Sequence, residues 1–264
     1  MKLRYAAATC AVVVVAATGG DHAAAETPAP RQLVEAAYEQ ERVPTMRIEI
    51  RMTIVDGSRQ WQRTATLESK QGRIGTQVER FTFRSPADLD GSSVLTQEQG
   101  GGDPAQWVYI PAYHTARRIA VSQRGEAYLG TDYFYEDVLD RRWDDYRYQS
   151  LGSETVDGAT VTKVEAIPVS DVVKRISPYS RTVYFVDAAR QVVLREEYYD
   201  RAGTLVKRLT KEALKRYGRY LLADQATMEN LQTGHKTVSR ITKREVNADI
   251  PDDTFTVRAL KRAF

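Results

Sequence analysis

A strict alternation of apolar and polar side chains constrains the fold of this chain most. Apolar residues occupy every second position over nine residues, and arginine, glutamate or threonine lies between them: Met46, Ile48, Ile50, Met52 and Ile54 form the apolar set. A period of two is typical of a β-strand with one buried face and one face in water. Asp56-Gly57 then signals a tight turn, and the apolar alternation continues on a return strand. The sequence therefore predicts a β-hairpin here.

The same kind of segment recurs through the rest of the chain. Further strands are predicted over residues 78–84, 106–110, 116–120, 146–151, 160–167, 181–186, 192–199, 205–209, 219–222, 226–231 and 236–246. Turn residues such as Asp157-Gly158 separate several of them. Because no long helical segment intervenes, the pattern indicates one large curved antiparallel sheet or barrel. No domain boundary stands out, so we expect a single domain over residues 26–264.

The amino terminus has the three-part form of a secretory signal. Lys2 and Arg4 precede an apolar run over residues 6–17, and small residues at 23–25 offer a cleavage site. The run has about twelve residues, fewer than the roughly 20 that a membrane-spanning helix needs. We therefore expect residues 1–25 to be a cleaved signal peptide and the mature protein to be periplasmic. After it, Leu33, Val34 and Ala37 recur at helical spacing. That helix either packs on the domain or covers a cavity.

Composition narrows the classes of function. The 38 basic and 35 acidic residues are intermixed and the net charge is +3, which offers no surface for nucleic acid. Cys10, the only cysteine, lies inside the predicted signal, so the mature chain has no thiol. A secreted chain without disulfides depends on an ordinary apolar core.

A curved sheet with an apolar concave side offers room for a lipid tail. A nine-residue strand spans roughly 30 Å, whereas a tail needs about half of the ~30 Å bilayer core. Burying some twelve methylenes gains on the order of 10 kcal/mol before ordering costs. The alternative is that the same side chains simply fill the core. The candidate lining residues, assigned from the alternation, are Met46, Ile48, Ile50, Met52, Trp61, Leu67, Phe81 and Phe83.

Evidence for catalysis is weak by comparison. Asp132, Glu136 and Asp137 lie close together in sequence, and two carboxylates can act as acid and base on a glycan. Such residues more often cap turns and pair with arginines. His114 and His235 are isolated and have no ligand partner at metal spacing. We therefore expect no enzyme, no metal and no cofactor, and keep a carbohydrate-active enzyme using Asp132 and Glu136 as a distant alternative.

Several motifs, taken in order, carry a resemblance to a known family. They are Phe83-Arg84-Ser85-Pro86-Ala87-Asp88-Leu89-Asp90-Gly91-Ser92, Trp107-Val108-Tyr109-Ile110-Pro111-Ala112, Arg117-Arg118-Ile119 and Gly130-Thr131-Asp132-Tyr133-Phe134-Tyr135-Glu136-Asp137. With these motifs the chain resembles the outer-membrane lipoprotein-sorting protein family related to the periplasmic lipoprotein carrier LolA. One departure is tyrosine at 128 and 133, where the family leads us to expect phenylalanine.

The resemblance implies an unclosed antiparallel β-barrel, a strongly curved sheet with short α-helices as a lid over its mouth. It implies a non-enzymatic carrier or chaperone for lipid or for the acyl chains of lipoproteins, in transient contact with membranes. It also implies an inner-membrane permease of the resistance-nodulation-division (RND) type as a partner. The alternative is an accessory subunit of such an exporter without cargo of its own.

Two further hypotheses concern local segments. Arginines and acids converge on one short region, and we expect them to latch a lid segment to the rim: Arg117, Arg118, Asp132, Glu136 and Asp137. Residues 170–177 can form a short helix with an apolar side beside Lys174 and Arg175. It either packs on its own sheet or touches a membrane or a partner. Residues 100–102 are all glycine and predict a flexible loop.

Overall fold

The structure, a computed structural model, describes residues 28–71, 76–98 and 103–261. The predicted signal segment and glycine loop lie outside these residues. Within them, the strands are β1 (Thr45–Asp56), β2 (Arg59–Gln71), β3 (Gln77–Ser85), β4 (Ser93–Gln97), β5 (Ala105–Ile110), β6 (Thr115–Arg118), β7 (Tyr146–Val156), β8 (Ala159–Pro168), β9 (Tyr179–Asp187), β10 (Val192–Asp200), β11 (Leu205–Tyr217), β12 (Tyr220–Asn230) and β13 (Lys236–Val246). The helices are α1 (Pro30–Glu41), α2 (Asp171–Ile176) and α3 (Val257–Leu260).

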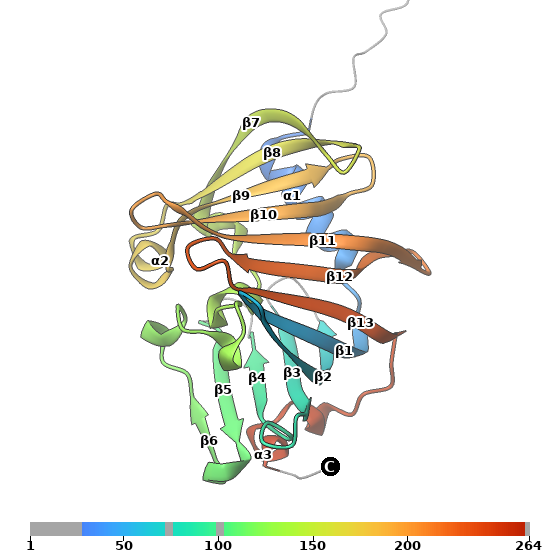
Figure 1. Cartoon of the computed structure of the whole chain (residues 1–264). Helices are drawn as coiled ribbons and strands as arrows, with labels where there is room; N and C mark the ends of the chain where they lie inside the picture. The colour runs from blue at the N-terminus through green and yellow to red at the C-terminus, as the bar shows by residue number, and fades with distance from the viewer. Residues whose placement is uncertain (1–27, 72–75, 99–102, 262–264) are drawn as a thin grey trace, which may run out of the picture.

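All thirteen strands belong to one antiparallel sheet in the order β6-β5-β4-β3-β2-β1-β13-β12-β11-β10-β9-β8-β7. The sheet is not closed, because β6 pairs only with β5 at one edge and β7 pairs only with β8 at the other. The mainly β, unclosed antiparallel fold predicted from the sequence is confirmed. Figure 1 shows the twisted sheet, with α1 behind the upper strands and α3 at the lower end.

Consecutive strands β6 and β7 lie at opposite edges of the sheet, which makes the segment between them unusual. Residues 119–145, here called the strap, pass over one face of the sheet from edge to edge. The strap contains no strand and only single turns of 3₁₀ helix: Val121–Gln123, Tyr128–Gly130, Tyr135–Val138 and Trp143–Asp145. We call the face that it covers the inner face.

Two elements cover the inner face. The strap covers the half made by β1 to β5, where its residues join an apolar cluster with those strands. Helix α1 covers the other half and packs on β7 to β10 and β12. Its buried residues Leu33, Val34 and Ala37, the predicted apolar stripe, meet Trp143 and Tyr184 in a second cluster. The helix thus packs on the sheet and roofs its inner face.

The carboxyl-terminal segment covers part of the outer face. Ala248, Ile250, Phe255 and Leu260 form a buried cluster with Leu95 of β4. Trp107 of β5 pairs with Leu95 and packs against the same cluster, so it faces away from the strap. Strands β3 to β5 are therefore covered on both sides.

This double burial explains one strand that the sequence did not reveal. β4 has only five residues, of which Ser93, Val94, Leu95 and Thr96 are all buried. A strand buried on both faces has no apolar and polar alternation to detect. β11 is longer than the predicted strand over residues 205–209. Its continuation to Tyr217 is mostly polar and shows no buried apolar alternation, and backbone pairing with β12 extends the strand there.

Candidate ligand cavity beneath the strap

The predicted lining residues come together on the inner face, with one exception. The register sets Ile48 of β1 opposite Leu67 of β2 and Leu67 opposite Phe81 of β3, so their side chains point the same way. Ile48, Ile50, Met52, Phe81 and Phe83 belong to one buried cluster, and Met46 and Leu67 pack against it. Trp61 lies outside this cluster. It is 38% exposed, and its ring lies 5.9 Å from that of His235.

A small cavity remains between these strands and the strap. It has a volume of about 170 Å³ and is lined from the sheet by Ile50, Met52, Leu67 and Phe81. From the strap side it is closed by Tyr128, Thr131, Tyr133 and Val138. An engineered cavity of about 150 Å³ admits a benzene ring. The space is therefore of ring size, shorter than the extended lipid tail that the strand length alone allows.

Aromatic side chains of the strap occupy the rest of the hollow. Tyr128 is 4% exposed and lies edge-on against Phe81, with ring centroids 5.5 Å apart. Its ring also contacts Tyr135 at 5.3 Å. Burial raises the pKa of the Tyr128 hydroxyl well above its usual value. Tyr128, which stands where the resemblance leads us to expect phenylalanine, thus packs as a core residue and fills part of the hollow.

The strap also separates three cavities. The second, of about 340 Å³, is lined by Val138, Leu139 and Asp140 together with α1, β11 and β12 residues. The third, of about 250 Å³, is lined by Leu139, Asp140 and Arg141 together with α2. Val138 borders the first and second cavities, and Leu139 and Asp140 border the second and third. A few strap residues are therefore the walls between neighbouring hollows.

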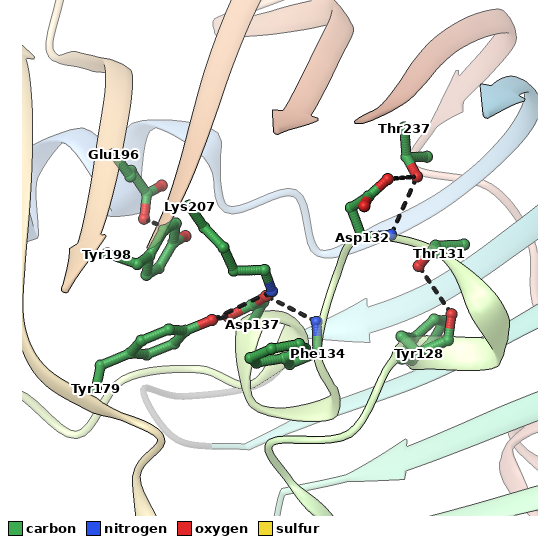
Figure 2. Close-up of polar contacts among 10 residues, drawn as sticks. All are labelled: Tyr128, Thr131, Asp132, Phe134, Asp137, Tyr179, Glu196, Tyr198, Lys207 and Thr237. Carbon is green, nitrogen blue, oxygen red and sulfur yellow. Dashed lines mark hydrogen bonds and ion pairs between the residues drawn. The ribbon is translucent and has the colours of Figure 1, made fainter. Parts of the chain in front are cut away.

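A buried ion pair fastens the middle of the strap to the sheet. The Lys207 Nζ of β11 lies 2.7 Å from the Asp137 Oδ2, and neither side chain is appreciably exposed. The Tyr179 hydroxyl of β9 donates to Asp137 Oδ1 at 2.6 Å, and the Phe134 backbone N–H donates to Oδ2 at 2.7 Å. Figure 2 shows these groups converging on one carboxylate. Burial lowers the pKa of Lys207, which Asp137 opposes.

A second anchor holds the strap to β13. Asp132 accepts a hydrogen bond from the Thr237 hydroxyl at 2.7 Å, and its own backbone N–H donates to that oxygen at 3.1 Å (Figure 2). The other carboxylate oxygen lies 2.7 Å from His235 Nδ1. Asp132 is 7% exposed, so both carboxylate oxygens are engaged inside the protein.

These contacts change the latch predicted from the sequence. Asp132 and Asp137 do fasten the strap, but within the described ranges no ion pair joins Arg117 or Arg118 to Asp132, Glu136 or Asp137. Arg117 donates instead to Gln123 at 3.0 Å, and Arg118 lies over the Trp107 ring at 5.8 Å. The arginines do not reach the acids because β6 lies at the edge of the sheet, whereas Asp132 and Asp137 contact residues on the central strands β11 and β13. The partners are distant in sequence: Lys207, Tyr179 and Thr237 lie on strands, and His235 lies just before β13.

Glu136 is held differently from its neighbours. It lines the third cavity near Arg124 and Arg141. Burial raises the pKa of the Glu136 carboxyl, and the two arginines oppose that effect. Arg141 itself lies among tyrosine rings, 5.5 Å from the centroids of both Tyr146 and Tyr184. These contacts fix the strap's last part against the sheet under α1.

A carboxyl cluster that the sequence did not indicate lies where the strap passes α1. Glu79 lines the first cavity, and Glu98 accepts a hydrogen bond from the Asp140 backbone at 2.7 Å. Arg42 pairs with the Asp140 carboxylate at 2.7 Å. Burial, with repulsion between the acids, raises the pKa of Glu79 to about 8 and that of Glu98 to about 7. Arg42 thus pairs with one of these carboxyl groups, and Arg42 and Arg124 partly offset the raised pKa of Glu98.

In the part of the chain that the structure describes, no group of three or more His, Cys, Asp or Glu side chains is placed to hold a metal ion. None of the described helices is long and apolar enough to cross a membrane.

Comparisons with known proteins agree with this architecture. A protein-family model, whose description reads "uncharacterized protein", matches residues 75–262. No curated protein matches the chain significantly. The structure is similar to an outer membrane lipoprotein-sorting protein domain from Vibrio parahaemolyticus, with a TM-score of 0.82 and 25% identity over 88% of this chain and 98% of that one. It is similar to a DUF1329 family protein from Desulfovibrio piger, with a TM-score of 0.80 and 26% identity over 88% and 97%.

A third structure shows the fold alone. It is a LolA superfamily protein from Nitrosomonas europaea, with a TM-score of 0.68 and 19% identity over 87% of this chain and 98% of that one. The chain therefore belongs to the family that the matching model describes, and the resemblance to LolA-like outer-membrane lipoprotein-sorting proteins predicted from its sequence is confirmed.

Proposed function

We propose that the protein is a periplasmic carrier that binds lipid, or the acyl chains of lipoproteins, on the inner face of its sheet. One observation carries the proposal: an apolar cavity lies beneath the strap, and Val138, Leu139 and Asp140 separate it from two neighbouring cavities that are lined largely by charged side chains. If the strap lifts, the three hollows merge into one groove with an apolar part, which suits an acyl chain, and a charged part, which suits a polar head group. The similar domain from Vibrio parahaemolyticus, described as lipoprotein-sorting, supports this assignment.

The free energy lost when the strap lifts is comparable with the free energy that a bound acyl chain regains. Lifting the strap exposes Tyr128 and Tyr135, and each buried side chain of this size contributes roughly 2 to 3 kcal/mol. An acyl chain that takes their place regains about 0.8 kcal/mol for each methylene it buries. A chain of about twelve methylenes therefore offsets the loss of the aromatic contacts and some of the anchors. The closed state protects the apolar face while no cargo is bound.

The contacts of the acidic residues support a role without catalysis. Asp132 already accepts from Thr237 and contacts His235, and Asp137 accepts three hydrogen bonds. Carboxylates engaged in this way serve to fasten the strap, whereas an acid and base pair for a glycan needs access to substrate. We propose that the carrier exchanges cargo with membrane components and with an RND-type permease, after removal of a signal peptide over residues 1–25.

Bound cargo is the first test. Protein purified gently from the periplasm is examined by native mass spectrometry, and we expect acyl lipid to be bound to it. A protein that is empty yet binds a permease tightly would favour the accessory-subunit alternative. Glycan turnover that is lost in Glu136→Gln would favour the enzyme.

A reversible lock tests the strap directly. Asp132 and Thr237 are in side-chain contact, and the mature chain has no cysteine, so Asp132→Cys with Thr237→Cys introduces the only two thiols. We expect uptake of a pyrene-labelled fatty acid to be lost in the oxidised variant and restored by reduction. The matched control, Thr155→Cys with Thr160→Cys, joins paired residues of the β7–β8 hairpin and should take up the probe in both states. Full uptake by the oxidised strap variant would refute strap opening.

A further inference from the structure

Helix α2 and its flanking residues form a tip that projects from the sheet (Figure 1). The tip, residues 169–177, begins after β8 and has a short helix capped by Ser170, whose side chain accepts from the Val173 N–H at 3.4 Å. Its apolar side chains are left in water, since Val169 is 47% exposed and Val172 is 50% exposed. Val169 precedes the cap and Val172 lies in the first turn of the helix, so about half of each side chain remains in contact with water.

Positive charge surrounds these valines. Lys174 and Arg175 are exposed on α2, and the exposed Arg201 donates to the backbone oxygens of Arg175 and Ser177 at 2.6 and 3.0 Å. On the helix itself, Asp171 lies 3.7 Å from Lys174 and is exposed, and Asp103 and Asp145 line the cavity that Val172 borders. Among the described residues, no carboxylate forms an ion pair with Arg175 or Arg201. The tip therefore presents apolar side chains with an excess of cations.

The tip also contacts the parts of the molecule that the carrier must move. Val172, Val173 and Ile176 form one wall of the 250 Å³ cavity, and strap residues Leu139 and Arg141 form another. At the start of the strap, Gly125 approaches Pro178 so closely that an added Cβ would lie 3.3 Å from its side chain. The tip therefore lies beside the strap, across a cavity from Leu139 and Arg141, and is followed directly by Pro178, which contacts Gly125.

We propose that this tip docks on an anionic lipid bilayer, with Val169 and Val172 entering the interface and Lys174, Arg175 and Arg201 meeting lipid phosphates. The inference rests on the proposed carrier function and names the surface from which cargo is exchanged. Charge complementarity selects this occupant, because exposed apolar residues flanked by cations suit the apolar and anionic layers of a membrane surface. Contact by so few residues is weak, which suits a carrier that must leave again.

Vesicle sedimentation tests the docking. The purified mature chain is mixed with vesicles of equimolar phosphatidylcholine and phosphatidylglycerol, and with vesicles of phosphatidylcholine alone. We expect binding to the anionic vesicles only, weakened by salt. Each basic residue near such a surface contributes about fivefold to binding. Lys174→Glu with Arg175→Glu should therefore reduce binding at least tenfold, and Val172→Asp should reduce it severalfold.

A matched charge reversal provides the control. Lys215 and Arg216 are also adjacent and exposed, but they lie at the far end of β11, away from α2 in Figure 1. Lys215→Glu with Arg216→Glu makes the same change in net charge and should bind vesicles as the unaltered protein does. Equal losses in both double variants would show that only overall charge matters, and no loss in the α2 variant would overturn the proposal.

Docking and cargo binding are separated by a second measurement on the same α2 variant. Its uptake of pyrene-labelled fatty acid from detergent micelles should equal that of the unaltered chain, because Lys174 and Arg175 line none of the three cavities beside the strap. Lost vesicle binding with intact uptake supports the docking site. Vesicle binding that persists in the variant refutes the docking site while leaving the carrier function untouched, and absent uptake in every variant refutes the carrier function itself.

Discussion

The two covers of the inner face, α1 and the strap, are held down in different ways. Helix α1 satisfies its own backbone and buries a continuous apolar stripe against β7 to β10. Its ion pairs, such as Lys211 with Glu41 at 2.8 Å, lie at its margins and are partly exposed. The strap has no regular structure beyond single 3₁₀ turns. Its aromatic side chains also join the apolar clusters of the sheet, but buried polar groups fasten it at separate points, Asp137 and Asp132 above all.

This difference indicates which cover moves. An element held by a broad apolar interface separates from its sheet only by losing all of that burial at once. An element held at separate points opens locally when those points release, and binding regions are drawn from such parts of a structure. The apolar cavity lies under the strap and not under the stripe of α1. In the carrier that we propose, the strap is therefore the cover that we expect to open for cargo, and α1 is the cover that we expect to stay in place.

Breaking the main anchor should have the largest effect. Lys207→Ala leaves the Asp137 carboxylate buried without its cation, and loss of one partner of a buried pair costs about 3 to 5 kcal/mol. Lys211→Ala on the α1 side breaks a pair that keeps some exposure to water, so its cost should be smaller, about 1 to 3 kcal/mol, between the values for surface and for buried pairs. Urea denaturation of both variants measures the difference. Lys207→Met combined with Asp137→Asn should recover much of the loss, and equal costs for the two single variants would contradict the comparison.

Truncating one buried side chain under each cover should separate stability from binding. Tyr128→Ala in the strap and Leu33→Ala in α1 each remove a buried apolar group, at a cost of about 2 to 4 kcal/mol. Tyr128 lines the 170 Å³ cavity, so its loss enlarges the cavity and should increase affinity for a pyrene-labelled fatty acid severalfold. Leu33 lies in the other cluster, so its loss should leave affinity unchanged. Fluorescence titration decides, and equal affinities would remove the strap from the binding site.

The carboxyl cluster beside the strap predicts a stability that falls as pH rises. Burial raises the pKa of Glu79 from its ordinary value of 4.5 to about 8, so the folded chain holds this proton more tightly than the unfolded chain. The stability is therefore fully present below about pH 4.5 and is lost as pH rises toward 8. Glu79→Gln should raise the free energy of unfolding by about 1 to 3 kcal/mol at pH 8.5 and change it little at pH 4.5.

Denaturation at these two pH values tests the assignment. Glu212→Gln, at an exposed position on β11, is the control and should give no difference between them. A gain from Glu79→Gln that is the same at both pH values would mean that packing, not titration, causes it.

Some strands could be predicted from the sequence, and others could not. The alternation from Met46 to Ile54 and the turn at Asp56-Gly57 specified β1, β2 and the apolar inner face, because each signal is local. Strand β4 gave no signal because it is buried on both faces. The open sheet followed from the resemblance and from the succession of strands, although no local pattern says that β6 and β7 lie at opposite edges.

The site was harder to predict because its contacts join residues that are distant in sequence. Asp132 and Asp137 stood out by their density of charge, but their partners are more than forty residues away and depend on which strands the strap crosses. Arg117 and Arg118 are near these acids in sequence but form no ion pair with them among the residues that the structure describes. Nearness along the chain predicts ion pairs on a helix, where residues three or four apart face each other, but not along an irregular segment that crosses a sheet.

The smallest effect on stability is expected at Arg118, which directly precedes the first residue of the strap. Arg118 is exposed on edge strand β6, where its guanidinium lies over the Trp107 ring on the outer face, and surface contacts of this kind contribute about 0.5 to 1 kcal/mol or less. Arg118→Ala should therefore change the free energy of unfolding by no more than that and leave fatty-acid uptake unchanged. Thr237→Val, which removes the hydroxyl that Asp132 contacts, should cost more, about 1 to 2 kcal/mol, and should speed uptake because it weakens an anchor. If Arg118→Ala altered uptake more than Thr237→Val, the strap would be governed from its edge, and the central anchors would be ordinary core contacts.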